Sequence, residues 1–461
     1  MKNWNEERGN MTGRHPVYQA ADKLKKAFLE LGFCLVDNGE DCEIEKADLA
    51  FATWREPEAL FGWQNHPIKM RQGHTVLRTR LLPAQLRREK RRPPLRLLAF
   101  GRVYRDNREI SMSCREKPVR HQEKPMHYQD NPMHHQMEGL VIEENPIPDA
   151  WKFFWQDFAC KLFGEEAVAA FELVYENTYK ISVSEKLDGK TYLIGYTGTA
   201  SRQALECCGA SGSTGWVFVI DVDQFALQYF SIRDVTVLYE NEVSVLERYQ
   251  SGETAVGESP ACQAVDILRQ MGYQETCGDV LYPDSAYKKM NMIQEEWDKN
   301  NRGYPLVEPL DGLTAVRTVL TPAIEETMAF NYRQGAASLR IFEVGHIYLP
   351  KGDEILPKEH IAVAFGAYGP DATIEWFTGE VRTFLTAMGI SNPKFVPTDA
   401  ATAYKWNECL IIMNGDTYIQ SNFGQINRTA TKNHGIGAPA YMANFELDAL
   451  VDSIKQESDS D

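Results

Sequence analysis

Three residues in two short stretches have the types and spacing to handle charged groups. Arg105 ends Gly-Arg-Val-Tyr-Arg over residues 101–105, and Gln136 and Glu138 lie in His-Gln-Met-Glu-Gly over residues 135–139. An arginine on a strand can bridge a phosphate and a carboxylate, and a carboxylate with an amide can hold an ammonium group. Because alternate residues of a strand share one face, we expect Gln136 and Glu138 to point into one pocket.

The elements that would hold these stretches follow from hydrophobic spacing. Ala20, Leu24 and Phe28 recur at helical intervals and predict an amphipathic helix over residues 15–33, with Gly32 as a stop signal. Other predicted helices cover residues 151–163, 224–230, 264–271 and 323–331, and predicted strands cover residues 95–100, 139–142, 216–220 and 339–343.

The fold class predicted from these elements is α+β. No regular strand–helix–strand alternation appears, so each half of the chain is expected to hold a mostly antiparallel sheet flanked by helices. A stretch rich in Gln, Ser, Gly and Thr separates the halves. We therefore predict a first domain over residues 1–249, a linker over 250–260, a second domain over 261–453 and an acidic tail over 454–461.

Composition restricts the class of protein. The chain has 461 residues and a net charge of −16, and a strongly acidic protein is not suited to indiscriminate phosphate binding. It has no apolar run long enough to span a membrane, no apolar signal core at the N-terminus and nine scattered cysteines, so we expect a cytoplasmic protein without a membrane partner. One basic cluster interrupts the acidic sequence, either as a solvated helix end and loop, the favoured reading, or as an RNA or nucleotide contact: Arg87, Arg88, Lys90, Arg91, Arg92 and Arg96.

A seven-residue repeat over residues 117–136 carries several histidines. Its prolines exclude a continuous helix, so an expanded loop between two strands is expected. The histidines are His121, His127, His134 and His135. Their spacing matches no standard ligand geometry, and we predict no metal site.

The motifs together resemble a known family. Residues 77–87, with 101–105 and 135–140, resemble the active-site core of the phenylalanyl-tRNA synthetase α subunit, a class II aminoacyl-tRNA synthetase. Residues 313–322 and 339–345 look like the catalytic-like module of the β subunit of that enzyme. The resemblance implies two class II antiparallel-sheet folds in tandem, a homodimer through the family's helix-bundle contact, and structural roles for Arg317 and Glu343.

The resemblance also implies roles for single residues. Arg105 matches the strand arginine that contacts ATP and the amino acid. Gln136 and Glu138 match the pair that holds the substrate ammonium. Tyr179 lies nearest to the family's Phe-Pro-Phe substrate element, and Arg80 is a candidate ATP contact.

Several positions depart from the family pattern. The family's Arg-Thr-His-Thr-Ser-Pro motif is here Arg-Thr-Arg-Leu-Leu-Pro over residues 78–83, so Arg80 and Leu82 replace the histidine and the serine. The acidic residue expected two after the strand arginine is Asn107. Gln224 stands where the family carries the arginine that clamps ATP, and a glutamine supplies no fixed positive charge.

Two functions remain open, and the retained motif strands weigh against a third, a purely structural partner of a genuine synthetase. The first is an enzyme that uses ATP and Mg²⁺ to form an aminoacyl-adenylate, with a tRNA, a carrier or a small molecule as acceptor. The second is a catalytically degenerate paralogue that binds an amino acid and acts as a regulatory or partner protein. The persistence of Arg105 favours the first, and the departures at Leu82 and Gln224 favour the second.

Overall fold

The computed structural model describes the chain as two compact units, one of residues 16–236 and one of residues 1–15 with 237–461. The described residues are 13–36, 43–47, 67–71, 73–82, 94–106, 131–143, 149–186, 189–207, 209–210, 212–249, 255–257, 259–290, 304–349, 351, 355–390, 392–397, 406–414 and 417–458. No helix in this part of the chain combines the length and the apolar character needed to span a bilayer.

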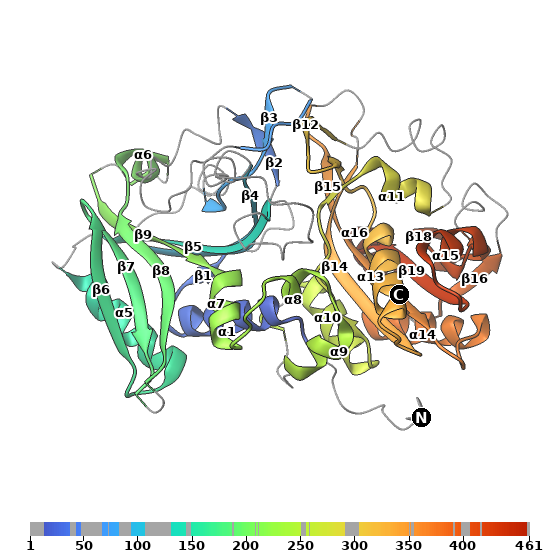
Figure 1. The fold of residues 1–461 in the computed structure, drawn as a ribbon. Helices are drawn as coiled ribbons and strands as arrows, with labels where there is room; N and C mark the ends of the chain where they lie inside the picture. The colour runs from blue at the N-terminus through green and yellow to red at the C-terminus, as the bar shows by residue number, and fades with distance from the viewer. Residues whose placement is uncertain are drawn as a thin grey trace, which may run out of the picture. The chain divides into compact units, whose positions relative to one another are not determined.

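The unit of residues 16–236 is built on a seven-stranded sheet in the order β1-β4-β5-β9-β8-β7-β6 (Figure 1). All its neighbouring strands are antiparallel except the edge pair β1–β4. The strands are β1 Cys34–Leu35, β4 Leu95–Tyr104, β5 Met133–Glu143, β6 Val168–Tyr175, β7 Thr178–Ser184, β8 Thr191–Thr199 and β9 Thr214–Asp221. The helices are α1 Pro16–Glu30, α5 Ala150–Phe163, α6 Arg202–Cys207 and α7 Val222–Tyr229, and a small sheet pairs β2 Ile44–Lys46 with β3 Thr75–Leu77.

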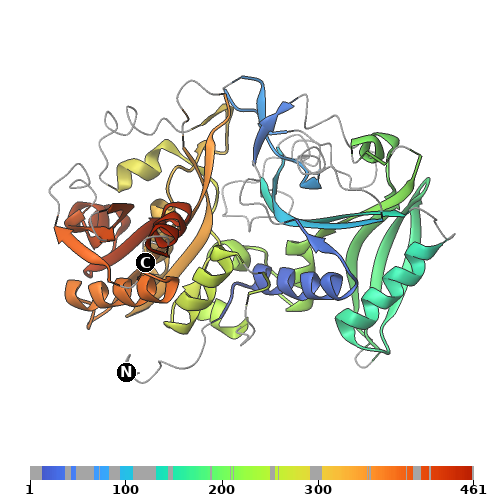
Figure 2. The same cartoon turned by 180° about the vertical axis from the view of Figure 1, so that it is seen from behind.

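An aromatic core joins helices α1 and α5 to one face of this sheet (Figure 2, α1 in blue and α5 in blue-green). The ring of Phe28 on α1 stacks on Phe218 of β9 at 4.7 Å and meets Trp155 of α5 edge-on at 6.0 Å. A β-carbon at Gly139 would lie 2.0 Å from the Phe218 ring, so only glycine fits opposite it. The expected apolar face of residues 15–33 therefore packs on the sheet, as α1.

The second unit repeats this arrangement with a sheet in the order β10-β14-β15-β19-β18-β17-β16. Its strands are β10 Gln274–Glu275, β14 Leu339–Leu349, β15 Lys358–Tyr368, β16 Lys394–Pro397, β17 Trp406–Asn414, β18 Thr417–Ile426 and β19 Ala440–Glu446. Its helices are α8 Thr236–Tyr239, whose first residue belongs to the other unit, α9 Val243–Leu246, α10 Pro260–Gln270, α11 Asp284–Lys289, α13 Thr321–Arg333, α14 Ile374–Met388, α15 Arg428–His434 and α16 Leu447–Ser458. A three-stranded sheet contains β11 Leu281–Tyr282, β12 Pro305–Leu310 and β13 Leu313–Val316.

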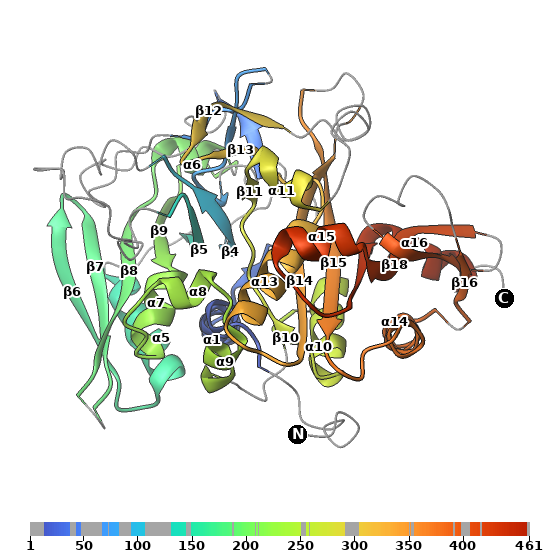
Figure 3. The same ribbon diagram turned by 45° about the vertical axis from the view of Figure 1, so that its right-hand side comes forward.

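Helices cover both faces of this second sheet (Figure 3). Phe342, Phe365 and Phe445 belong to the core cluster that α10, α14 and α16 close. On the other face, Ile324 and Met328 of α13 pack into a separate cluster with α15. The expected class, α+β with two mostly antiparallel sheets flanked by helices in tandem, is confirmed.

Candidate functional site

The first unit places Gln136 and Glu138 side by side on one face of β5. Gln136 pairs with Gly101 of β4 and with Asp221 of β9. In the same strand register, Glu138 pairs with Ala99 of β4. Residues opposite each other on neighbouring strands share a face, so the small residues Gly101 and Ala99 flank the two polar ones. A β-carbon at Gly101 would lie 2.7 Å from Nη2 of Arg78, so glycine there admits that guanidinium. This face lies opposite the one that carries Phe218.

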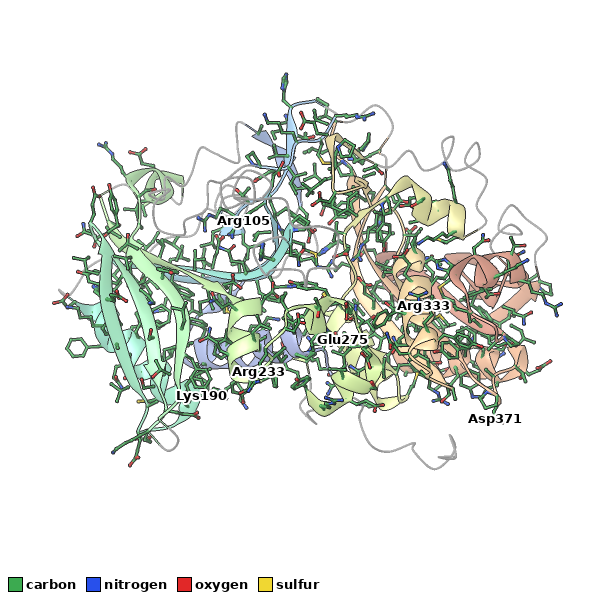
Figure 4. All side chains as sticks on the ribbon, viewed as in Figure 1. Arg105, Lys190, Arg233, Glu275, Arg333 and Asp371 are labelled. Atoms are coloured by element: carbon green, nitrogen blue, oxygen red, sulfur yellow. The ribbon has the colours of Figure 1, made fainter. Side chains whose placement is uncertain are left out.

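A hydrogen-bonded row connects the three residues singled out in the sequence. Arg105, just beyond the end of β4 (labelled in Figure 4), donates from Nη2 to Gln136 Oε1 at 3.0 Å. Gln136 donates in turn from Nε2 to Glu138 Oε1 at 3.2 Å. All three side chains are at least 98% buried, and charge-assisted hydrogen bonds away from water fix their positions.

The segment after β3 supplies further contacts to the same carboxylate. The backbone N–H of Leu82 donates to Glu138 Oε2 at 3.1 Å, and Nη1 of Arg80 lies 3.9 Å from Glu138 Oε1. The side chain of Leu82 belongs to an apolar cluster with Leu140. Because the contact comes from the backbone, it does not depend on the leucine side chain at this position.

The start of α7 closes the row on the β9 side. Asp221 caps the helix by accepting from the N–H of Gln224 at 2.9 Å. This cap places Gln224 in the first turn, beside Gln136 and Asp221 in the lining of a small cavity. Gln224 therefore lies beside the polar row as a neutral amide.

A buried histidine–aspartate pair, which no local sequence pattern predicts, holds α7 to β5. Asp223 accepts from the backbone N–H of His135 at 2.8 Å and lies 2.9 Å from its Nδ1. Burial alone would raise the pKa of Asp223, but the charge and hydrogen bonds of His135 outweigh it and lower that pKa. The ring of His135 meets Tyr18 of α1 edge-on at 5.7 Å, so this pair also connects to the helix layer.

His134 lies on the same face of β5 as Gln136. Burial, together with the nearby charge of Arg105, lowers the pKa of His134 from 6.5 to about 3. The imidazole is therefore neutral at physiological pH and adds no charge beside Arg105.

The cavity among these residues is small. It has a volume of about 50 Å³ and is lined by His134, His135, Gln136, Leu193, Ile194, Gly195, Tyr196, Val219, Asp221 and Gln224. A β-carbon at Gly195 would lie 2.1 Å from the carbonyl oxygen of Val219, so glycine is required in this wall. The described residues thus enclose space for one small polar group rather than for a whole ligand.

The strand register separates Tyr179 from this face. Tyr179 pairs with Thr197, which pairs with Phe218, so Tyr179 lies in the row of the helix-covered face. There its ring contacts Trp151 of α5 at 4.6 Å. The neighbouring Lys180 instead shares a row, through Tyr196 and Val219, with Glu138.

The other predicted features lie partly outside the described residues. Asn107, residues 117–130 of the repeat with His121 and His127, most of the linker and the last three residues of the tail are outside them. So is the basic cluster apart from Arg96, whose Nη1 donates to the carbonyl of Leu31 at 2.6 Å. Among the described residues, no group of three or more His, Cys, Asp or Glu side chains is placed to hold a metal ion.

The second sheet carries different residues at the corresponding positions. Ala362 pairs with Gly345 and Glu446, as Gln136 pairs with Gly101 and Asp221. Two residues on, Ala364 stands where the first sheet has Glu138. In the described part of the chain, therefore, the polar row on β5 of the first sheet has no counterpart on β15 of the second.

Two known families match parts of the chain. A family described as "tRNA synthetases class II core domain (F)" matches residues 3–249, more than half of the chain. A second, described as "Phenylalanyl tRNA synthetase beta chain CLM domain", matches residues 258–447.

Individual relatives agree with the first match. The chain is 29% identical over 259 residues to the phenylalanine–tRNA ligase alpha subunit of Caldanaerobacter subterraneus subsp. tengcongensis, which covers 51% of this chain and 69% of the relative. It is 26% identical over 261 residues to the same subunit of Alkaliphilus oremlandii, with the same coverage. A solved structure of a pyrrolysyl tRNA synthetase from Desulfitobacterium hafniense, PylSc, matches at 22% identity with a TM-score of 0.35, covering 42% of this chain and 67% of the other.

Proposed function

Because this chain belongs to the class II tRNA synthetase core domain (F) family, we propose that it activates an amino acid with ATP. The hydrogen-bonded row from Arg105 through Gln136 to Glu138 is the observation that carries the proposal. It offers a guanidinium for the phosphate and carboxylate and, two residues apart on one strand, an amide and a carboxylate for the ammonium.

In this reaction a carboxylate oxygen of the amino acid attacks the α-phosphorus of ATP, and the bond to the departing pyrophosphate breaks. Arg105 would stabilise the negative charge that develops on the phosphoryl oxygens. Its position is fixed by Gln136 in advance, so little reorganisation is needed as the charge forms. Arg80, 3.9 Å from Glu138, is the second buried guanidinium close to the row and the candidate for a further phosphate contact.

The residues that line the cavity offer one carboxylate to a magnesium ion. Asp221 is the carboxylate in the cavity lining, and Mg²⁺ is commonly held by one or two carboxylates together with substrate phosphates. Asp221 would hold an ion that arrives with the nucleotide, and this ion would neutralise phosphate charge. We propose a tRNA, a carrier or a small molecule as acceptor, a cytoplasmic location and a homodimer, as the family resemblance implies.

A second candidate function is an amino-acid-binding regulatory or partner protein without ATP chemistry. Two observations favour it. Gln224 brings no charge to the start of α7. Each oxygen of Glu138 already accepts a hydrogen bond from the protein, one from Leu82 and one from Gln136, which leaves fewer lone pairs for an incoming ammonium.

One experiment separates the two candidates. Amino-acid-dependent exchange between ATP and pyrophosphate is measured with the full chain, magnesium and the twenty standard amino acids plus polar and aromatic analogues. Exchange with one compound establishes activation and identifies the substrate. Silence, with thermal stabilisation by an amino acid that Glu138→Ala abolishes and no shift with ATP, establishes the binding protein instead.

A further inference from the structure

A larger cavity lies in the second unit, away from the polar row. It has a volume of about 380 Å³, within the range of small-molecule sites. Its walls come from α13, α11 and α15, from residues 239–241 and from the loop around residues 278–283. In Figure 3, α15 lies beside α13 in this unit.

The cavity exists because α13 has two different sides. Ile324 and Met328 face the sheet and are fully buried in its apolar cluster. Ala323, Thr327 and Phe330, spaced four and three residues apart, line the cavity, and the small side chains of the first two leave it open.

Asparagine side chains hold the opposite wall in place. Asn331 of α13 accepts from the N–H of Val243 at 2.9 Å and donates to the carbonyl of Asn241 at 3.0 Å. Asn241 bonds both the N–H and the carbonyl of Cys277, at 2.8 and 3.0 Å. A β-carbon at Gly278 would lie 2.7 Å from that of Ala323, so this loop approaches α13 as closely as a backbone can. The cavity is therefore preformed.

The lining offers both signs of charge. Arg333, at the C-terminal end of α13 (labelled in Figure 4), is exposed and donates from Nη1 to the carbonyl of His434 at 3.3 Å. Among the described residues its guanidinium has no carboxylate partner. Lys289 and Glu326 form an ion pair at 3.0 Å with both side chains 48% exposed, and such a pair opens at little cost.

Donors and apolar surface complete the lining. Burial raises the pKa of Tyr282, so its phenol, beside Arg317, remains protonated and can donate a hydrogen bond. The rings of Tyr239 and Phe330, with Leu281, provide apolar wall.

We propose that this cavity binds a small zwitterion with an apolar body, for which a free α-amino acid is the simplest candidate. Arg333 receives the carboxylate, Glu326 receives the ammonium, and Tyr239 with Phe330 packs against the apolar part. Acidic residues in the lining, Glu240, Asp279 and Glu326, disfavour a phosphate dianion. This would be a second ligand site, in the other unit from the proposed activation site and independent of it.

The test uses a full-length chain whose first site is disabled by Glu138→Ala, or by Glu138→Gln if the alanine variant does not fold. Isothermal titration with the twenty standard amino acids should find one that binds at one equivalent. Benzoate and phenethylamine, which each carry one of the two charges, should bind at least about tenfold more weakly.

Variants then place that ligand. Adding Arg333→Gln should weaken its binding about tenfold, and adding Thr327→Leu, which fills the cavity, should abolish it. Adding Arg428→Gln, at an exposed arginine on α15 outside the cavity lining, should leave binding unchanged.

Two results would overturn the proposal: no amino acid binds the Glu138 variant, or one binds and Arg333→Gln leaves its affinity unchanged. If Thr327→Leu does not fold, the affinity measured with Arg333→Gln, a change at an exposed position, decides the test. Pyrophosphate exchange by the unaltered chain is measured separately. Failure of the proposed activation and failure of the proposed second binding site are therefore distinguished.

Discussion

Arg78 and Arg317 occupy equivalent positions in the two units, just after β3 and just after β13. Nε of Arg78 donates to the carbonyl of Arg102 on β4 at 2.8 Å, and Nε of Arg317 donates to the carbonyl of His346 on β14, also at 2.8 Å. Each arginine begins an Arg-Thr-x-Leu-x-Pro sequence, over residues 78–83 and 317–322. Each therefore ties the preceding segment to the second strand of its seven-stranded sheet, β4 or β14.

The buried contacts of Arg317 should be essential for the stability of the second unit. Nη1 of Arg317 lies 2.5 Å from Glu343 Oε1, and both side chains are at most 1% exposed. Arg317→Ala would leave that carboxylate buried without its guanidinium, so we expect the free energy of unfolding to fall by about 3 kcal/mol or more. Urea unfolding followed by circular dichroism measures it, with Arg428→Gln expected within about 0.5 kcal/mol of the unaltered chain. A loss below about 1 kcal/mol would show that the pair is not a structural requirement.

Arg105 should be required for amino-acid activation. Arg105→Ala removes the guanidinium that Gln136 positions, and loss of one preorganised contact to a developing charge commonly lowers the rate by about 100-fold or more. Pyrophosphate exchange measures this loss. Arg202→Gln, at a side chain 93% exposed, is the matched control and should exchange normally. Unchanged exchange in Arg105→Ala would remove this residue from the mechanism.

Stability should depend on pH through His134. Its pKa is lowered from 6.5 to about 3 by burial and by Arg105, so between these values the unfolded chain binds a proton that the folded chain does not. The contribution is complete above the unfolded pKa and is lost as the pH falls, by about 2 kcal/mol between pH 7 and pH 5. His134→Gln cannot titrate and should lose about that much less over the same interval in urea unfolding. Parallel pH profiles for the two proteins would contradict the buried, neutral histidine.

Gln224 should limit catalysis if the chain is an activating enzyme. Its backbone N–H is held by Asp221 in the first turn of α7, and it lies in the cavity lining beside Gln136. Gln224→Arg places a positive charge there and should raise kcat/KM for ATP in the exchange assay by about tenfold or more. Gln224→Lys tests whether charge alone suffices or whether the guanidinium geometry is needed. A decrease with both variants would mean that the site uses its glutamine for another purpose.

Local periodicity accounts for what could be predicted without the fold. The spacing of Ala20, Leu24 and Phe28 predicted the buried face of α1, and the alternation of Gln136 and Glu138 predicted their shared face on β5. Both patterns act over one or two turns or pleats, so they are readable in any stretch that forms a regular element. The repeated Arg-Thr-x-Leu-x-Pro sequence is also visible in the chain, and it could have predicted that Arg78 and Arg317 make equivalent contacts.

Contacts between distant segments were decided by the tertiary structure. Asp223 meets His135 across 88 residues, and the N–H of Leu82 reaches Glu138 across 56. Neither contact has a local pattern, because it depends on where α7 docks and how the segment after β3 turns. The face on which Tyr179 lies likewise depends on strand register, since a shift of one residue would exchange it with Lys180. The sequence alone thus determined the family, the two tandem α+β folds and the polar row, while register and docking decided which partners satisfy that row and where a second cavity opens.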